Sequence, residues 1–251
     1  MKIEYLKQFS KQLQRDMEWK IFGHRGKPCL VFPAQDGRFY DYENFGMIEA
    51  AKQWIDRGEI QFFCIDSIDL ETWSNKNGDP RQRILLHETW YRYITEEVVP
   101  QIMAISTRGN DDLKPTGILT TGCSMGGAHA MNFFLRRPDL FDMVLSLSGI
   151  YRADFFFENY MDDLVYINSP IDYMQNLPLD HPYIEMFQKR KIIMCCGQGE
   201  WEDDMIVSTR QLEAIFKVKQ IPVWTDFWGI DAAHDWVWWK KQLPYFLTKL
   251  L

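Results

Sequence analysis

A serine set among closely spaced glycines is the feature of this sequence with the clearest chemical potential. The run Gly122–Gly127, which contains Ser124, follows an apolar segment with strand character, Gly117–Thr121, and precedes a segment with helical character, Ala128–Leu135. Strand, tight turn and helix in this order are typical of a nucleophile elbow, where small flanking residues let the serine hydroxyl project from the turn. The backbone N–H of Met125, at the start of the helix, can face a developing oxyanion. We therefore predict that Ser124 is a nucleophile and that Met125 belongs to an oxyanion hole.

A serine nucleophile needs a general base, and one of the five histidines is suitably placed. In folds with this elbow the acid and then the histidine follow the serine along the chain. His24 and His87 precede the serine, His129 lies on the helix directly behind it, and His181 precedes the strand after which the acid is expected. His234 lies in a loop between the last expected strand and the terminal helix. We predict that His234 is the base.

The acid is expected in the loop that follows the apolar segment Lys191–Cys196. This loop contains four carboxylates, at positions Glu200, Glu202, Asp203 and Asp204. One of them would orient the imidazole and stabilise the imidazolium. The others would cap the next helix, since acidic residues favour a helix N-terminus.

The segments around these residues alternate between strand and helix character. A hairpin of Trp19–Phe22 and Pro28–Phe32 is expected first, and the further expected elements are a helix at Ile48–Asp56, a strand at Gln61–Ile65, a helix at Glu88–Ile105, a strand at Met143–Ser148, a helix at Thr209–Phe216, a strand at Val223–Phe227 and a helix at Trp236–Leu250. This alternation predicts an α/β fold whose mostly parallel sheet has helices on both faces. No linker interrupts it, so we expect a single domain over residues 1–251. Residues 151–188 are irregular and rich in aromatics, which fits either a cap-like insertion over a site or an elaborated loop. The run Phe155–Phe157 fits either an acyl pocket or core packing.

The composition excludes several classes of protein. Of the 251 residues, 46% are hydrophobic and 25% are charged, as in ordinary globular proteins and unlike disordered or fibrous ones. A net charge of −7 gives no basic surface for nucleic acid or an anionic membrane. The five cysteines form no C-x-x-C pair, so neither a disulfide framework nor a zinc site is indicated, and reduced thiols favour the cytoplasm. The charged N-terminal residues do not resemble a signal peptide, and no stretch is long enough to span a membrane.

Several motifs together resemble the esterase D-type branch of the α/β-hydrolases. They are the elbow Gly122–Gly127, the turn Arg137–Phe141, the segment Ser146–Gly149, the preceding helix Tyr93–Pro100 and the histidine motif His234–Trp236 with Trp238 and Trp239. The resemblance covers about residues 17 to 250. It implies an α/β-hydrolase fold and a cofactor-free serine hydrolase acting on a carboxylic ester or thioester.

The sequence departs from this branch at two points of the site. Many members carry His-Gly after the first core strand, where this chain has Phe32–Gly37, so the second oxyanion donor is assigned to the backbone N–H of Gln35 or a neighbour. The acid loop is longer than the usual Gly-x-x-Asp. Counting back from the helix at Thr209 favours Asp203, whereas counting forward from the loop glycines gives Glu202 or Glu200. We take Asp203 as the acid, with Glu202 as the alternative.

The resemblance thus predicts an esterase that uses Ser124, Asp203 and His234 on a small-molecule ester. An acyltransferase on the same scaffold and a non-catalytic binding protein of this fold are the alternatives. We expect no metal or cofactor and no nucleic-acid or membrane partner, whereas a homo-oligomer is compatible with the sequence.

Overall fold

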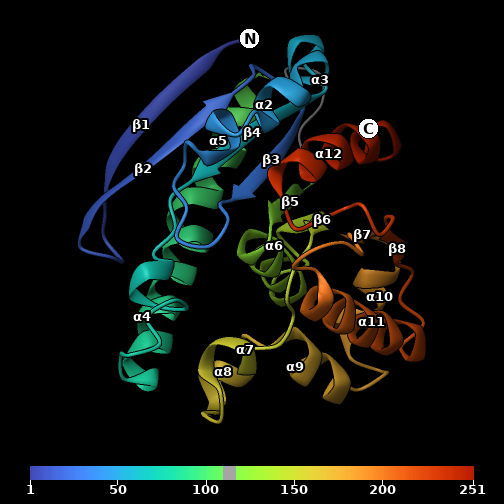
Figure 1. The fold of residues 1–251 in the computed structure, drawn as a ribbon. Coiled ribbons are helices and arrows are strands. Elements are labelled where there is room, and N and C mark those ends of the chain that lie inside the picture. The colour runs from blue at the N-terminus through green and yellow to red at the C-terminus, as the bar shows by residue number, and fades with distance from the viewer. Residues whose placement is uncertain (110–116) are drawn as a thin grey trace.

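An eight-stranded sheet runs through the computed structural model, which describes residues 1–109 and 117–251 (Figure 1). In chain order the strands are β1 (Ile3–Ser10), β2 (Arg15–Phe22), β3 (Lys27–Phe32), β4 (Ile60–Ile65), β5 (Ile118–Cys123), β6 (Phe141–Leu147), β7 (Lys191–Cys196) and β8 (Trp224–Phe227). Their order across the sheet is β1-β2-β4-β3-β5-β6-β7-β8. The pairs from β4 to β8 are parallel, and β1 and β2 add an antiparallel edge. The predicted mostly parallel α/β sheet is confirmed.

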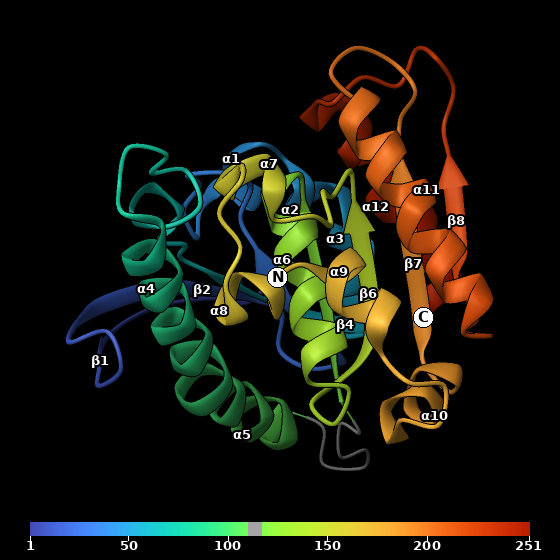
Figure 2. The same ribbon diagram turned by 90° about the horizontal axis from the view of Figure 1, so that it is seen from below.

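Alternate residues of the central strands enter two different hydrophobic layers. In β3, Leu30 and Phe32 belong to the larger core cluster, whereas Cys29 and Val31 belong to a second cluster on the opposite face. Successive side chains of a strand point to opposite faces, so a strand covered on both faces must be apolar throughout. Helices accordingly cover both sides of the sheet (Figure 2).

The helices divide between these two faces. One face is covered by α1 (Asp41–Asn44), α2 (Met47–Ala50), α3 (Lys52–Arg57) and α12 (Trp236–Leu250). The other is covered by α4 (Pro80–Arg92), the π-helix η2 (Tyr93–Val98), α5 (Val99–Gly109), α6 (Met125–Arg136), α9 (Pro170–Asn176), α10 (Pro182–Gln188) and α11 (Asp203–Val218). Three short helices complete the fold, namely η1 (Asp69–Glu71), α7 (Asp154–Phe157) and α8 (Asp163–Tyr166). No helix of the described ranges combines the length and the apolar character needed to cross a membrane.

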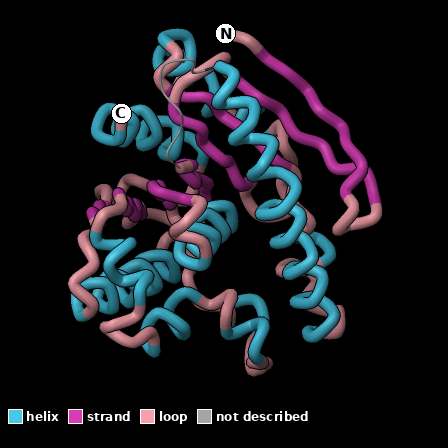
Figure 3. Tube along the Cα trace, turned by 180° about the vertical axis from the view of Figure 1, so that it is seen from behind, coloured by secondary structure: helices cyan, strands magenta, loops and turns pink. Residues whose placement is uncertain are grey.

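The N-terminal strands correct one expectation. The predicted hairpin of Trp19–Phe22 with Pro28–Phe32 is wrong, because β4 lies between β2 and β3 and pairs with both. The preceding strand β1 was not foreseen. Its apolar residues Ile3, Tyr5 and Phe9 lie at alternate positions, but Lys7 interrupts this period and all three are exposed. The turn after β1 is held by Gln12, whose backbone N–H donates to Glu97 Oε1 of η2 at 2.8 Å. Figure 3 shows the β1–β2 ribbon beside the long helix formed by α4, η2 and α5.

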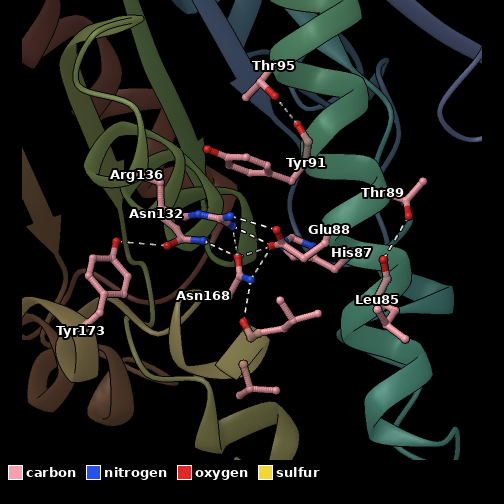
Figure 4. A network of polar contacts seen from close by, with 12 residues as sticks. Leu85, His87, Glu88, Thr89, Tyr91, Thr95, Asn132, Arg136, Asn168 and Tyr173 are labelled. Atoms are coloured by element: carbon pink, nitrogen blue, oxygen red, sulfur yellow. Dashed lines mark hydrogen bonds and ion pairs between the residues drawn. The ribbon is translucent and has the colours of Figure 1, made fainter. Parts of the chain in front are cut away.

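A buried polar network joins the segment between β6 and β7 to the helices of the larger core (Figure 4). Asn168 donates to Glu88 Oε1 of α4 at 2.7 Å and accepts from Asn132 and Arg136 of α6, both at 2.8 Å. Arg136 also donates to both carboxylate oxygens of Glu88. The Asn168 amide therefore connects the predicted cap-like insertion at residues 151–188 to two helices that pack on the sheet.

Candidate active site

Ser124 occupies the sharp turn between β5 and α6. Its backbone has φ 57° and ψ −123°, a conformation that residues other than glycine rarely adopt. The Ser124 N–H donates to the carbonyl of Leu147 at the end of β6, at 2.9 Å. The elbow expected from the sequence is therefore present, with the serine at the carboxyl end of the parallel strands.

Two glycines make this turn possible because no side chain fits at their positions. A Cβ on Gly122 would lie 2.4 Å from the backbone of Gly126. A Cβ on Gly126 would lie 2.3 Å from the carbonyl oxygen of Phe32, in β3. Any side chain at either position would push the elbow away from the central strands.

His234 lies in the loop between β8 and α12, and its ring reaches Ser124. The distance from His234 Nε2 to Ser124 Oγ is 2.8 Å, which is hydrogen-bond distance. The imidazole also packs edge-to-face on Trp239, with ring centroids 4.9 Å apart. The structure thus brings together the two residues that the sequence analysis assigned as nucleophile and base.

Glu202 lies on the other side of the imidazole. Its Oε2 atom is 3.4 Å from His234 Nδ1, an ion-pair distance without hydrogen-bond geometry. The carboxylate is fully buried and accepts hydrogen bonds from Ser148 Oγ at 2.5 Å and from the Gly197 N–H at 3.3 Å, both on Oε1. A buried carboxylate requires such donors, because unpaired burial of its charge is very costly.

Asp203, the preferred acid of the sequence analysis, is not at this position. It is exposed as the first residue of α11, whereas its neighbour Glu202 turns into the protein just before the helix begins. Glu200, the other alternative, is also exposed, and its backbone carbonyl accepts a hydrogen bond from the His234 N–H at 2.9 Å. The structure therefore places the alternative acid Glu202 beside His234.

Glycines in the acid loop allow it to pack tightly against the histidine loop. The Gly199 N–H donates to the carbonyl of Ala232 at 2.9 Å. A Cβ on Gly197 would lie only 2.0 Å from that same carbonyl oxygen, and one on Gly199 would lie 2.8 Å from the Ala232 carbonyl carbon. This close contact fixes the distance between the loop that carries Glu202 and the loop that carries His234.

A cavity of about 390 Å³ opens over the nucleophile. Ser124, His234, Met125 and Gln35 contribute to its wall, so four of the predicted site residues share one space. The rest of the lining is largely apolar or aromatic and consists of Ser148, Ile150, Phe155, Phe156, Trp201, Asp204 and Met205. Such a mixture of apolar walls and a few polar groups is typical of small-molecule sites.

Part of the aromatic run in the insertion faces this cavity. Phe155 and Phe156 line it, whereas Phe157 and Phe156 also pack on the buried Trp73. Phe155 therefore belongs to the cavity wall, Phe157 to the core packing, and Phe156 to both. Among the described residues, no group of three or more histidine, cysteine or acidic side chains is arranged to hold a metal ion.

The sequence analysis missed two polar residues beneath the site. Ser148, directly after β6, donates to Glu202, and Trp239 of α12 donates from Nε1 to Ser148 Oγ at 3.0 Å. Both had been placed in motifs of the resemblance, Ser148 in the segment Ser146–Gly149 and Trp239 in the histidine motif, but neither had been given a role in the site. The pairing of a buried serine with a buried indole N–H depends on tertiary contacts that no local pattern encodes.

Comparisons with known proteins agree with this architecture. A family model described as putative esterase matches residues 10–250. A search of curated protein sequences finds no significant match.

Solved structures with the same fold cover nearly the whole chain. A ferulic acid esterase has a TM-score of 0.72 at 17% identity, and the alignment covers 100% of this chain and 99% of that one. S-formylglutathione hydrolases from Agrobacterium tumefaciens and Staphylococcus aureus have TM-scores of 0.70 and 0.68. The first is 14% identical, with 98% of this chain and 93% of that one covered, and the second is 16% identical, with 99% and 96% covered.

Proposed function

The chain belongs to the putative esterase family, and from this premise we propose that it cleaves a carboxylic ester or thioester through an acyl-enzyme on Ser124. The observation that carries the proposal is the 2.8 Å contact between Ser124 Oγ and His234 Nε2 at the floor of the cavity. We assign Glu202 as the acid, because its buried carboxylate lies beside the opposite nitrogen of the imidazole.

In the first half of the reaction, Ser124 Oγ attacks the acyl carbon while His234 Nε2 takes the hydroxyl proton. The carbonyl π bond breaks and its electron pair moves to the oxygen. The backbone N–H groups of Met125 and Gln35 are the proposed donors to this oxyanion. Glu202 holds the imidazole with its Nδ1–H towards the carboxylate and stabilises the imidazolium.

Collapse of the tetrahedral intermediate breaks the bond to the leaving group. His234 delivers its proton to the departing alcohol or thiol, which leaves an acyl ester on Ser124. Water then attacks this ester, again with His234 as base, and releases the carboxylic acid. The proton balance closes over the two halves, because His234 gains one proton and loses one proton in each.

A fluorophosphonate probe tests the nucleophile without knowledge of the natural substrate. We expect stoichiometric labelling of the folded protein, no labelling of Ser124→Ala, and no labelling of the heat-unfolded wild type. A panel of p-nitrophenyl esters of graded acyl length, run beside Ser124→Ala, measures the esterase activity. Turnover by Ser124→Ala at the wild-type rate would refute the proposal, and a wild type that neither labels nor hydrolyses any ester would favour a non-catalytic binding protein.

We also propose a cytoplasmic location. All five cysteines are buried and unpaired, which suits a reducing compartment, as was expected from the sequence. A homo-oligomer stays a prediction, and sedimentation velocity would test it.

A further inference from the structure

We propose that Ser148 is a positioning residue of the esterase, which holds the Glu202 carboxylate so that one oxygen faces His234, and that Trp239 in turn fixes the Ser148 hydroxyl. This inference rests on the proposed function. Ser148 lies in the wall of the cavity, but its hydroxyl is engaged by Trp239 and Glu202, so we infer that both residues act through Glu202.

The direction of the hydrogen bonds follows from the chemistry of the groups. The indole N–H of Trp239 can only donate, so Ser148 Oγ accepts at 3.0 Å. The single hydroxyl hydrogen of Ser148 is then free to go to Glu202 Oε1, which is 2.5 Å away. An ionised carboxylate can only accept. The chain of contacts therefore has one direction, from Trp239 through Ser148 to Glu202.

These contacts select the rotation of the carboxylate. Ser148 and the Gly197 N–H both donate to Oε1, and this leaves Oε2 towards His234 Nδ1 at 3.4 Å. Without the Ser148 hydroxyl, the Gly197 N–H at 3.3 Å is the one donor to Oε1 that remains among the described residues. The carboxylate would lose its shortest hydrogen bond and much of its orientation.

The setting is dry, so the loss would not be replaced easily by solvent. Ser148 and Glu202 are fully buried, and Trp239 is 3% exposed. Ser148 also has φ 51°, an uncommon backbone conformation for a residue with a side chain. Its N–H donates to the Cys195 carbonyl at 2.7 Å, which anchors the strained residue to the end of β7. Strain of this kind is kept where surrounding contacts fix it and is concentrated at functional sites.

Few other titratable groups act on Glu202. His234 faces it from the loop before α12, Cys196 Sγ lies 3.4 Å from Oε2, and Cys195 and Cys123 are the further neighbours from β7 and β5. Burial raises the pKa of each of these three thiols, so they stay protonated across the pH range in which a histidine titrates. These thiols therefore add no charge beside Glu202 over the acid limb of the activity profile.

The test is the rate of fluorophosphonate labelling of Ser148→Ala between about pH 5 and 9. We expect labelling at neutral pH to be at least about tenfold slower than in the wild type, because a charge-assisted hydrogen bond is lost. We also expect the midpoint of the acid limb to move to higher pH. Loss of the donor leaves more of the carboxylate's negative charge uncompensated beside His234. This charge favours the imidazolium, which cannot act as the base.

Ser146→Ala is the matched control. Ser146 is equally buried in β6, and its hydroxyl is hydrogen-bonded to the Gly127 carbonyl and to the Tyr151 hydroxyl, not to Glu202. A generally weakened fold lowers the amount of active protein at all pH values, whereas a displaced carboxylate moves the midpoint. We therefore expect Ser146→Ala to keep the wild-type midpoint, and an equal shift in both variants would overturn the inference.

Trp239→Phe keeps an aromatic ring beside His234 and removes the donor to Ser148, so it tests the chain of contacts even if Ser148→Ala does not fold. We expect slower labelling and a midpoint shift in the same direction as in Ser148→Ala. If a folded Ser148→Ala, or failing that Trp239→Phe, matches the wild type in rate and midpoint, the inference is overturned and the proposed function stands. A wild type that is not labelled at Ser124 overturns both.

Discussion

Oε2 of Glu202 lies 3.4 Å from Nδ1 of His234, whereas Asp203, one residue further along, is exposed to solvent. The difference arises because α11 begins at Asp203, while Glu202 is the residue before the helix. Its carboxylate lies inside the protein, where it accepts hydrogen bonds from Ser148 and the Gly197 N–H. Two adjacent carboxylates of similar chemistry therefore have different environments, and only Glu202 of the two lies beside the imidazole.

The first prediction separates these two carboxylates by substitution. Glu202→Gln should lower kcat by about 10³- to 10⁴-fold, as expected when the imidazole loses the carboxylate that sets its tautomer. Asp203→Asn, the matched control one residue away, should stay within about threefold of wild type, because an exposed residue at a helix N-terminus contributes only about 1 kcal/mol to stability. The measurement is hydrolysis of p-nitrophenyl acetate. A severe loss in Asp203→Asn with a mild one in Glu202→Gln would reverse the assignment.

The elbow and the histidine could be predicted because local sequence restricts them strongly. Ser124 stands between glycines that tolerate no Cβ, and His234 is selected by chain order among five histidines. The acid could not be fixed in the same way, since its position depends on where α11 begins, and helix boundaries shift by one or two residues without a clear sequence signal. A shift of one residue is enough to exchange Glu202 for Asp203.

The fold shows the same division between local and long-range information. The parallel core could be predicted from apolar segments that alternate with helices. The strand order could not, because the insertion of β4 between β2 and β3 is decided by pairing between segments about forty residues apart. The cap-like role of residues 151–188 stays a prediction, although Asn168 shows how the segment is attached.

The second prediction concerns pH and the buried His87. Its ring accepts a hydrogen bond from Trp73 Nε1 at 2.9 Å and lies 3.1 Å from Asn168 Oδ1, and burial holds its pKa well below the ordinary 6.5. The unfolded chain therefore takes up a proton near pH 6.5 that the folded protein excludes. The free energy of unfolding should fall as the pH drops below about 6.5, by up to about 1.4 kcal/mol per pH unit from this group.

Urea unfolding between about pH 5 and 8 measures this effect. His87→Gln should show a shallower pH dependence than the wild type, by about one proton, whereas a substitution of the exposed His24 to Gln should leave the slope unchanged. Parallel curves for His87→Gln and the wild type would show that the buried ring is not the group responsible.

The third prediction concerns the attachment of the insertion. Asn168→Ala removes the amide that binds Glu88 and accepts from Asn132 and Arg136, and it leaves these buried groups with fewer partners (Figure 4). We expect a loss of about 2–4 kcal/mol in the free energy of unfolding. Asn176→Ala is the control, because that asparagine makes exposed contacts in α9 and should change stability by less than about 0.5 kcal/mol. If denaturant unfolding shows an equal loss of free energy of unfolding for the two substitutions, the network does not attach residues 151–188 to the helices.

The last prediction concerns the mouth of the cavity. Trp201 lines the cavity that contains Ser124, yet it is 76% exposed and has φ 67°. Phe155, 41% exposed, lines the same cavity. A large aromatic side chain kept in solvent beside a nucleophile, on a strained backbone, is suited to cover an apolar part of the ester.

Trp201→Ala should therefore raise KM about three- to tenfold for p-nitrophenyl esters with long acyl chains, since apolar contact area is lost from the complex. The effect on KM for p-nitrophenyl acetate should be smaller, because its short acyl group offers little apolar area to the indole. Val218→Ala provides the control, as Val218 is similarly exposed at 72% but lies at the far end of α11 and does not line this cavity. If KM rises equally for short and long esters, the substitution acts by disturbing the neighbouring Glu202. If KM for the long esters does not change, the indole makes no contact with the substrate.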